Sequence, residues 1–175
     1  MKIYGVTGWK NCGKTGLMER LVSEITARGY RVSTVKHAHH SFDVDQPGRD
    51  SYRHREAGAQ EVLLVSGNRW ALMHELREQE EPPLEQLLTK LTDVDLVLVE
   101  GYKREAHPKI EAHRKEAGKP LIAPEDATIQ ALASDQPAHA HPDVTCPVFD
   151  LNDTAALATF VLQETGLLRH AAKTA

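Results

Sequence analysis

Two glycines, a lysine and a threonine near the start of the chain have the spacing of a phosphate-binding loop, G-x-x-x-x-G-K-[ST]. Glycines here let backbone N–H groups turn toward phosphate oxygens, and a helix beginning at the lysine points its positive dipole end at them. We expect Lys14 to reach the β- and γ-phosphates and the Thr15 hydroxyl to bind Mg²⁺. The residues predicted to bind the nucleotide are Gly8, Trp9, Lys10, Asn11, Cys12, Gly13, Lys14, Thr15 and Gly16.

A carboxylate at the end of a later apolar run can supply the second half of a magnesium site. The run DLVLVEG, residues 95–101, is typical of a fully buried parallel strand, and Glu100 stands at its end. Transfer or hydrolysis of a γ-phosphate needs a carboxylate at the metal, so we predict that Glu100 binds the metal and acts with Lys14 in catalysis. Aspartate is the usual residue here, which leaves open whether Glu100 binds directly or through water. A surface glutamate at a strand end is the alternative.

Three aspartates lie in residues 37–50, a long stretch without hydrophobic periodicity, and one of them is expected to complete the metal site. We favour Asp50, because it can cap the helix that follows and so be held rigidly, with Asp43 second; Asp45 is the remaining candidate. Lys36 ends the preceding strand. It either meets a phosphate or a second substrate, or it is a solvated lysine.

A histidine cluster in the same stretch offers a different metal chemistry. His37, His39 and His40 stand next to Asp43, and histidine is the commonest ligand of transition metals. No cysteine lies nearby, so we favour solvated or phosphate-facing histidines. A histidine-rich metal chaperone stays a minor alternative.

The nucleotide base is predicted less directly. The chain has no N-K-x-D, the element by which many proteins bind guanine. Asp135 follows a late strand and can accept hydrogen bonds from guanine N1 and N2, with residues 147–149 flanking the ring. The alternative, equally open, is that Asp135 and residues 147–149 are loop residues with no role in binding the base.

The elements that must position these residues alternate between strand and helix. Strands are predicted at 3–7, 31–36, 62–65, 69–74, 95–100, 109–113, 129–134 and 148–151, and helices at 14–28, 51–57, 84–91 and from 154 onward. This order predicts an α/β fold, the three-layer P-loop NTPase fold, with a mainly parallel sheet and antiparallel edge strands or a hairpin at 69–74 and 109–113. We predict a single nucleotide-binding domain over 1–168 and a frayed tail over 169–175.

Composition excludes several classes of function. The 175 residues hold 21 Lys and Arg against 25 Asp and Glu, a net charge of −4 that argues against nucleic acid as a partner. Two cysteines, Cys12 and Cys146, form no disulfide or zinc pattern, which favours the reducing cytoplasm. No apolar run approaches the ~20 residues that would cross a membrane, and no export signal is expected.

Three ordered segments together resemble the MobB family of molybdopterin-guanine dinucleotide biosynthesis adapter proteins. They are GWKNCGKT, HAHHSFDVDQPGRDSYRHREAGA and LVLVEGYKREAHPKIEAHR. The resemblance implies a homodimeric GTP-binding protein with weak GTPase activity and Mg²⁺ as its metal. It also implies the guanylyltransferase MobA and molybdopterin, or the finished molybdenum cofactor, as partners.

The wider class of dimeric P-loop proteins includes dethiobiotin synthetase, and the resemblance implies metal ligands at Thr15, Asp50 and Glu100. Members often carry a lysine directly after the first glycine, where this chain has Trp9, with Lys10 one place late. Basic residues after the Glu-Gly strand end suit an anionic pterin phosphate, or form a solvated basic hairpin. They are Lys103, Arg104, Lys109, Arg114 and Lys115.

Two functions from different classes therefore follow from the sequence. We favour an adapter that binds GTP and Mg²⁺ and hydrolyses GTP slowly, because no catalytic base or arginine finger is obvious. The alternative is an ATP-dependent small-molecule synthetase or kinase, which would require an acceptor for turnover.

Overall fold

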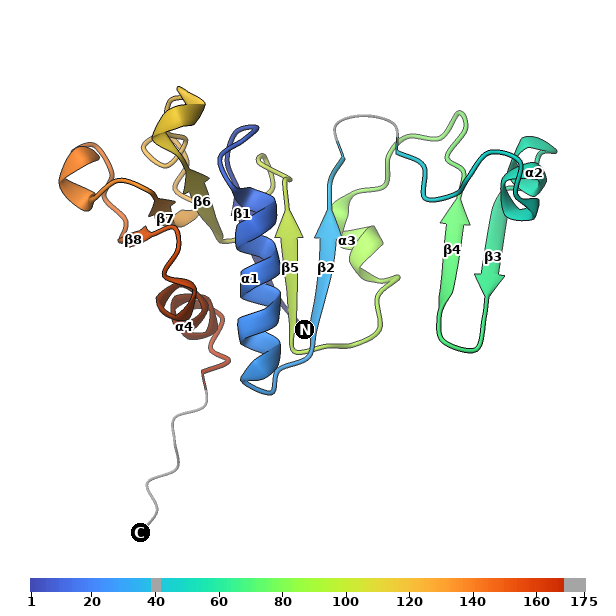
Figure 1. Ribbon diagram of the computed structural model, residues 1–175, viewed down its shortest axis with the longest axis horizontal. Helices are drawn as coiled ribbons and strands as arrows, with labels where there is room; N and C mark the ends of the chain where they lie inside the picture. Colours follow the sequence, from blue (N-terminus) through green and yellow to red (C-terminus); the bar gives the residue numbers. More distant parts are fainter. Residues whose placement is uncertain (39–41, 169–175) are drawn as a thin grey trace, which may run out of the picture. The chain divides into compact units, whose positions relative to one another are not determined.

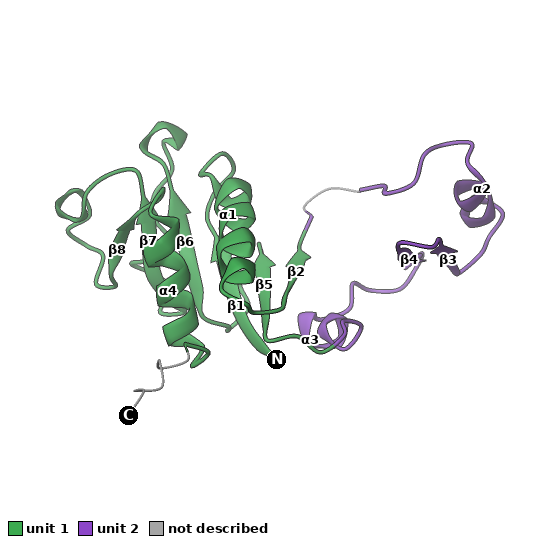
Figure 2. Cartoon of the chain, turned by 60° about the horizontal axis from the view of Figure 1, so that its bottom comes forward, with its two compact units in different colours: residues 1–37, 93–175 green, residues 38–92 purple. Residues whose placement is uncertain are grey.

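The computed structural model describes residues 1–38 and 42–168, and the chain forms two compact units (Figure 2). Unit 1 combines Met1–His37 with the chain from Asp93 onward, and unit 2 comprises Ala38–Thr92. The sequence predicts one domain over 1–168, and the second unit is an insertion in that span. The predicted tail, 169–175, lies outside the described residues.

Unit 1 is built on a six-stranded parallel sheet in the order β2-β5-β1-β6-β7-β8 (Figure 1). This confirms the predicted α/β fold with a mainly parallel sheet. The strands are β1 (Lys2–Thr7), β2 (Val32–Lys36), β5 (Leu96–Glu100), β6 (Lys109–His113), β7 (Ile129–Ser134) and β8 (Val148–Asp150). Glu100 is in register with Val6 of β1 on one side and Lys36 of β2 on the other. The carboxyl end of β5 therefore lies beside the start of the phosphate-binding loop.

Two helices, α1 (Lys14–Ala27) and α4 (Thr154–Glu164), pack against each other and against one face of this sheet (Figure 1). Alternate residues of each central strand point into this core, as Tyr4 and Val6 do in β1. Helix α4 begins as predicted, because the Asp153 carboxylate accepts a hydrogen bond from the backbone N–H of Ala156. Two 3₁₀ turns, Lys115–Ala117 and Ala138–Ala140, complete the unit.

Strand β6 differs from its prediction as an antiparallel edge. It runs parallel to both β1 and β7 in the middle of the sheet, and all five of its residues are buried. The alternating sequence KIEAH is typical of a half-exposed strand, but its polar residues find partners inside the protein. Lys109 donates to the carbonyls of Glu105 and His107 and to Thr128 Oγ1.

Glu111, the next residue on that face, is also fully buried. Its carboxylate accepts hydrogen bonds from the backbone N–H groups of Ile122, at 3.0 Å, and Ala123, at 2.8 Å. Burial raises the pKa of the Glu111 carboxyl. Burying a polar group that has hydrogen-bond partners costs far less free energy than burying an unpaired one. A strand of this sequence can therefore lie at the centre of the sheet.

The free energy of unfolding is expected to fall as the pH drops below about 6.5, the unperturbed pKa of histidine. Burial, with the Lys109 cation next, lowers the pKa of His107 to about 4, and burial and then His113 lower the pKa of His141. The unfolded chain binds more protons in that range, so acidification favours unfolding by about 2 to 3 kcal/mol for His107. Denaturant unfolding at about pH 7.5 and pH 4.5 measures this loss. In His107→Leu the loss should shrink; an unchanged loss would rule out His107 as its source.

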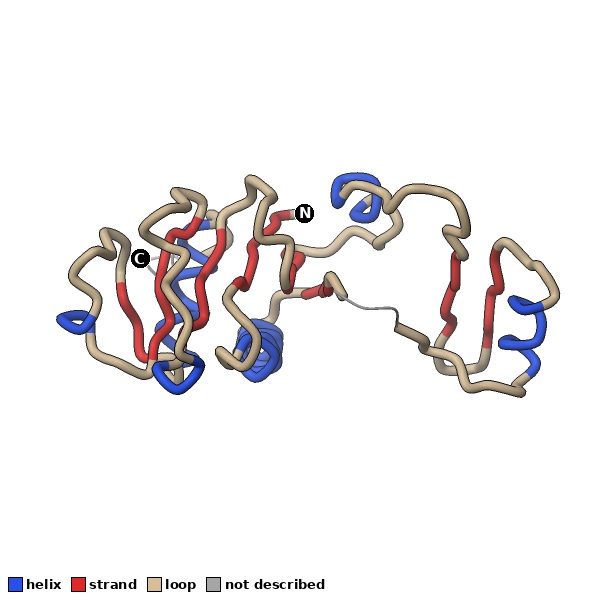
Figure 3. Tube along the Cα trace, turned by 90° about the horizontal axis from the view of Figure 1, so that it is seen from above, coloured by secondary structure: helices blue, strands red, loops and turns tan. Residues whose placement is uncertain are grey.

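Unit 2 contains two helices, α2 (Asp50–Glu56) and α3 (Leu84–Leu88), and two strands, β3 (Glu61–Val65) and β4 (Trp70–His74). The strands pair antiparallel as a hairpin, as predicted, but form a two-stranded sheet of their own rather than an edge of the main sheet (Figure 3). Helix α3 is shorter than the predicted 84–91. No helix within residues 1–38 and 42–168 is long and apolar enough to span a membrane.

Candidate phosphate-binding site

The loop between β1 and α1 takes the conformation that its glycines allow. Gly8, Asn11 and Gly13 have positive φ angles of 135°, 68° and 89°. These reversals curl the backbone into a compact loop, and α1 begins directly afterwards at Lys14. Cys12, a free cysteine, is buried inside the loop.

Lys14 reaches across this loop, and its Nζ donates a hydrogen bond to the carbonyl of Trp9 at 2.7 Å. Burial lowers the pKa of the Lys14 ammonium, and the nearby Glu100 carboxylate opposes this. The side chain is thus held at the mouth of the loop, next to the N-terminus of α1. A cation at a helix N-terminus is unfavourable alone, so the arrangement suits an anion between them.

Thr15 and Glu100, two of the residues that the sequence predicts as metal ligands, lie next to each other in the structure. The Thr15 hydroxyl donates to Glu100 Oε1 at 3.4 Å, and the same oxygen lies 3.4 Å from Lys36 Nζ. Adjacent ligands of an octahedral Mg²⁺ lie about 3 Å apart, because each Mg–O distance is about 2.1 Å. A hydroxyl and a carboxylate at this separation fit two neighbouring positions of such an ion. The structure places the Lys36 ammonium beside the Glu100 carboxylate, a contact that neither predicted alternative for Lys36 includes.

Trp9 is fixed on two sides. Its Nε1 donates to the carbonyl of Pro120 at 2.8 Å, and the Nζ of Lys103 lies 3.8 Å from the ring centroid. Lys10 and Asn11 are exposed at the tip of the loop. Neither contact of Trp9 could be predicted, since the partners lie far away in the sequence and follow no motif.

Arg114 lies against the second glycine of the loop. A Cβ added to Gly13 would come 2.9 Å from Arg114 Nε, at a φ of +89° that side chains rarely adopt. Arg114 is one of five basic residues after the Glu-Gly strand end that are predicted to suit a pterin phosphate. Lys109 does not fit that group, because its side chain is fully buried and bound to two carbonyls and a hydroxyl.

Asp135, the predicted guanine-binding residue, is exposed directly after β7. One of its oxygens accepts a hydrogen bond from the backbone N–H of Lys115 at 3.0 Å. This contact joins the loops that follow β6 and β7 at the same end of the sheet as the phosphate-binding loop. Phe149, predicted to flank the base, instead packs on Phe160 with ring centroids 5.2 Å apart.

Asp50 belongs to unit 2, and its predicted place at the metal stays a prediction. The expectation that it caps α2 is wrong: Arg49 is the N-cap residue, and Asp50 is the first residue of the helix. Its side chain is exposed and lies 4.0 Å from Arg53, one helical turn away. The rigidity that favoured Asp50 over its neighbours is therefore not observed.

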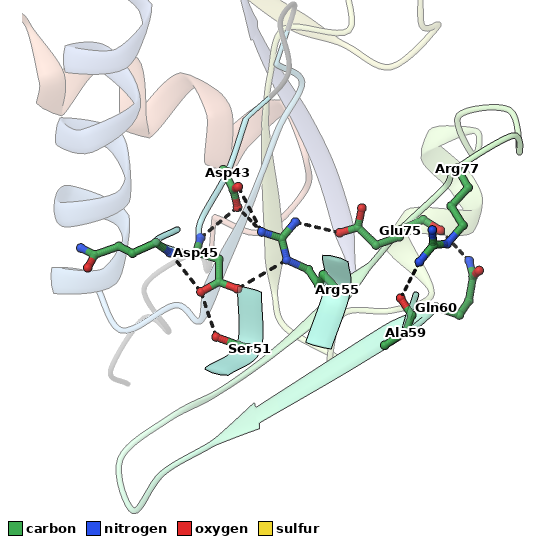
Figure 4. Close-up of polar contacts among 9 residues, drawn as sticks. Asp43, Asp45, Ser51, Arg55, Ala59, Gln60, Glu75 and Arg77 are labelled. Atoms are coloured by element: carbon green, nitrogen blue, oxygen red, sulfur yellow. Dashed lines mark hydrogen bonds and ion pairs between the residues drawn. The ribbon is translucent and has the colours of Figure 1, made fainter. Parts of the chain in front are cut away.

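Asp43 and Asp45 are instead the aspartates held in place within unit 2 (Figure 4). Arg55 lies 2.8 Å from Asp43, 3.4 Å from Asp45 and 3.0 Å from Glu75. The backbone N–H of Asp45 and then Arg55 lower the pKa of Asp43. Arg55 thus compensates the charge of both aspartates and ties the segment before α2 to this helix, and its ion pair with Glu75 ties α2 to the end of β4.

The histidine cluster is only partly described, because His39 and His40 lie outside the described residues. His37 packs on the ring of Tyr102 at 4.7 Å, and its backbone N–H donates to the carbonyl of Glu100. Within residues 1–38 and 42–168 no three His, Cys, Asp or Glu side chains form a group that could hold a metal.

Replacing Gly8 by alanine is expected to destabilise unit 1 by about 3 kcal/mol or more. The new Cβ would lie 2.4 Å from the backbone oxygen of Ala112, at a φ of +135° that side chains avoid. Gly29→Ala is the control, since Gly29 has a φ of +88° but no atom within 4 Å of the added Cβ. Denaturant unfolding compares the two variants. Equal losses would show that the contact with β6 does not constrain the loop.

Comparison with known proteins agrees with the family resemblance. The family model "Molybdopterin guanine dinucleotide synthesis protein B" (MobB) matches residues 3–135. A molybdopterin-guanine dinucleotide biosynthesis adapter protein of Escherichia coli (strain K12) is 42% identical over 164 residues, 92% of this chain and 91% of the relative. The protein of the same name from Haemophilus influenzae is 40% identical, over 91% of this chain and 86% of the relative.

Solved structures share the fold. The crystal structure of a MobB protein homolog from Bacillus stearothermophilus has a TM-score of 0.68 and 28% identity, with 95% of this chain and 99% of that chain covered. That of Bacillus subtilis MobB has a TM-score of 0.74 over 94% of this chain and 98% of that chain.

Proposed function

This chain belongs to the molybdopterin guanine dinucleotide synthesis protein B family, and from that premise we propose that it is a GTP-binding adapter. It assists the synthesis of molybdopterin guanine dinucleotide or the delivery of the finished cofactor. The two relatives at 42% and 40% identity are both named as adapter proteins of that biosynthesis. They support the role, and the loop at residues 8–16 supports the nucleotide.

The observation that carries the proposal is the meeting of Thr15 and Glu100 beside Lys14. Lys14 and the backbone N–H groups at the start of α1 are suited to bind the β- and γ-phosphates. The 3.4 Å pair of Thr15 and Glu100 would hold Mg²⁺, which neutralises charge on the phosphate oxygens when bound. Asp135 is our candidate for guanine, because within the described residues only one of its two oxygens accepts a hydrogen bond, from the backbone N–H of Lys115.

Slow hydrolysis is part of the proposal. Glu100 contacts both Thr15 and Lys36, which suits metal binding better than removal of a proton from water. Rapid hydrolysis by related folds uses a residue that orients the water and an arginine that stabilises the transition state. We therefore expect GTP to act mainly as a bound ligand.

We also propose that the chain acts as a homodimer, and the hairpin of unit 2 supports this. Leu63, Val65, Trp70 and Leu72 share one face of β3 and β4 and are exposed, with Trp70 63% accessible. A second copy of the chain would cover such an apolar face. Light scattering should give twice the mass of one chain, and a single-chain mass would contradict the dimer.

A reconstituted reaction tests the adapter role. Purified guanylyltransferase, molybdopterin and GTP are combined with increasing amounts of this protein, and dinucleotide formation is followed. We expect a higher yield or rate with the wild-type chain and no gain with Lys14→Ala. No effect at any protein ratio would contradict a role at the guanylylation step.

A further inference from the structure

Lys103 is brought to the phosphate-binding loop by a turn far along the chain. Its Nζ lies 3.8 Å from the centroid of the Trp9 ring. An ammonium group within about 6 Å of an aromatic ring centroid is attracted by the electrons of the ring face. Trp9 itself is the second residue of the phosphate-binding loop, and its ring edge is tied to Pro120 by the 2.8 Å hydrogen bond. The ring is therefore a fixed platform that carries a cation.

A strained turn directs Lys103 to this platform. Gly101 and Tyr102 follow β5 with positive φ angles of 95° and 46°, and Tyr102 is one of few residues other than glycine in this conformation. A Cβ on Gly101 would come 3.1 Å from the Cβ of His37, so the turn is packed tightly. Strain of this kind persists where the surrounding structure demands it, often at binding sites. Here it reverses the chain just after Glu100.

Lys103 and Lys14 act on each other electrostatically. Burial lowers the pKa of the Lys103 ammonium, and the positive charge of Lys14 lowers it further, against a weaker opposing effect of Cys12 and Glu111. Two ammonium groups that repel each other are together stabilised by a multiply charged anion.

We propose that Lys103 contacts the terminal phosphate of a nucleoside triphosphate held by the phosphate-binding loop, with Trp9 as the residue that positions it. This rests on the proposed nucleotide binding. The terminal phosphate is indicated because Lys103 follows the Glu100 turn, and Glu100 pairs with Thr15 at the metal end of the loop. Lys14, which repels Lys103, is the residue placed at the β- and γ-phosphates by the loop pattern.

Calorimetric titration with Mg²⁺ and either GDP or a non-hydrolysable GTP analogue tests this contact. Loss of one charge-assisted hydrogen bond should weaken binding of the triphosphate about 10- to 30-fold in Lys103→Ala, and of GDP less than about 3-fold. Lys103→Arg should recover most of the affinity. Lys2→Ala is the matched control, because Lys2 is an exposed lysine at the opposite end of β1.

The positioning role of Trp9 has its own readout. Trp9→Leu keeps an apolar side chain without the ring face, and the triphosphate preference should drop as in Lys103→Ala. In the double variant the two losses should not add, because both remove the same contact. Thermal unfolding of each variant checks that the fold is kept, and Lys103→Gln replaces Lys103→Ala if the latter unfolds.

The outcomes separate the inference from the proposed function. If the wild-type chain binds neither nucleotide, both are overturned. If it binds GTP and Lys103→Ala weakens the two nucleotides equally or not at all, only the role of Lys103 is overturned. Additive losses in the double variant would overturn the positioning by Trp9.

Discussion

Lys14→Ala is expected to weaken GTP binding by about 1,000-fold, the largest effect of any single change considered for this chain. Truncation of a charged partner of a bound phosphate costs about 2 to 5 kcal/mol, and each 1.4 kcal/mol is a factor of about ten. The Lys14 ammonium donates only to the loop carbonyl of Trp9 among the hydrogen bonds of the described residues, so little folding energy is lost with it. Calorimetry with GTP and Mg²⁺ measures the change.

Thermal unfolding without nucleotide is the control for Lys14→Ala. The variant should unfold within a few degrees of the wild type and lose only the stabilisation that added GTP provides. An affinity within about tenfold of the wild type would show that residues 8–16 do not bind the phosphates in the way the pattern predicts.

Glu100→Gln is expected to lower Mg²⁺-dependent GTP hydrolysis about 100-fold while nucleotide binding without metal is largely kept. The amide keeps the shape of the side chain but removes the charge that would bind the ion beside Thr15. The ion pair with Lys36 is lost as well, but Lys36 is 58% exposed, so its contribution to stability is small. Phosphate release against Mg²⁺ concentration is the measurement.

Lys36→Met separates the two partners of Glu100. It removes the ion pair and leaves the carboxylate, so its hydrolysis should stay much closer to that of the wild type. Normal hydrolysis by Glu100→Gln would make the predicted metal site wrong.

The parts of the site set by local sequence could be predicted. The loop at residues 8–15, the helix that starts at Lys14 and the buried strand that ends at Glu100 each follow from a short pattern, and the structure brings Thr15 and Glu100 together. Parallel strands end at one edge of a sheet, so two motifs at strand ends meet even when 85 residues separate them.

The parts of the fold and of the site that depend on residues far apart in the sequence could not be predicted. Strand β6 is predicted as an antiparallel edge, and its burial at the centre of the sheet depends on the carbonyls and the hydroxyl that surround Lys109. The hydrogen bond from Trp9 Nε1 to the carbonyl of Pro120 joins residues 111 positions apart, and no sequence pattern predicts it. The prediction of Asp50 as a metal ligand depends on the preference for aspartate at the N-cap of a helix. Helix α2 instead has Arg49 as its N-cap residue, and no side chain there accepts a capping hydrogen bond.

Binding of GTP against ATP tests the central claim most directly. The purified chain is titrated with each nucleotide in the presence of Mg²⁺, and binding heat and phosphate release are recorded. The account predicts selective binding of GTP with slow hydrolysis, lost in Lys14→Ala. Preference for ATP would contradict it and favour the synthetase or kinase alternative, and no binding of either nucleotide would refute the proposed role of the phosphate-binding loop.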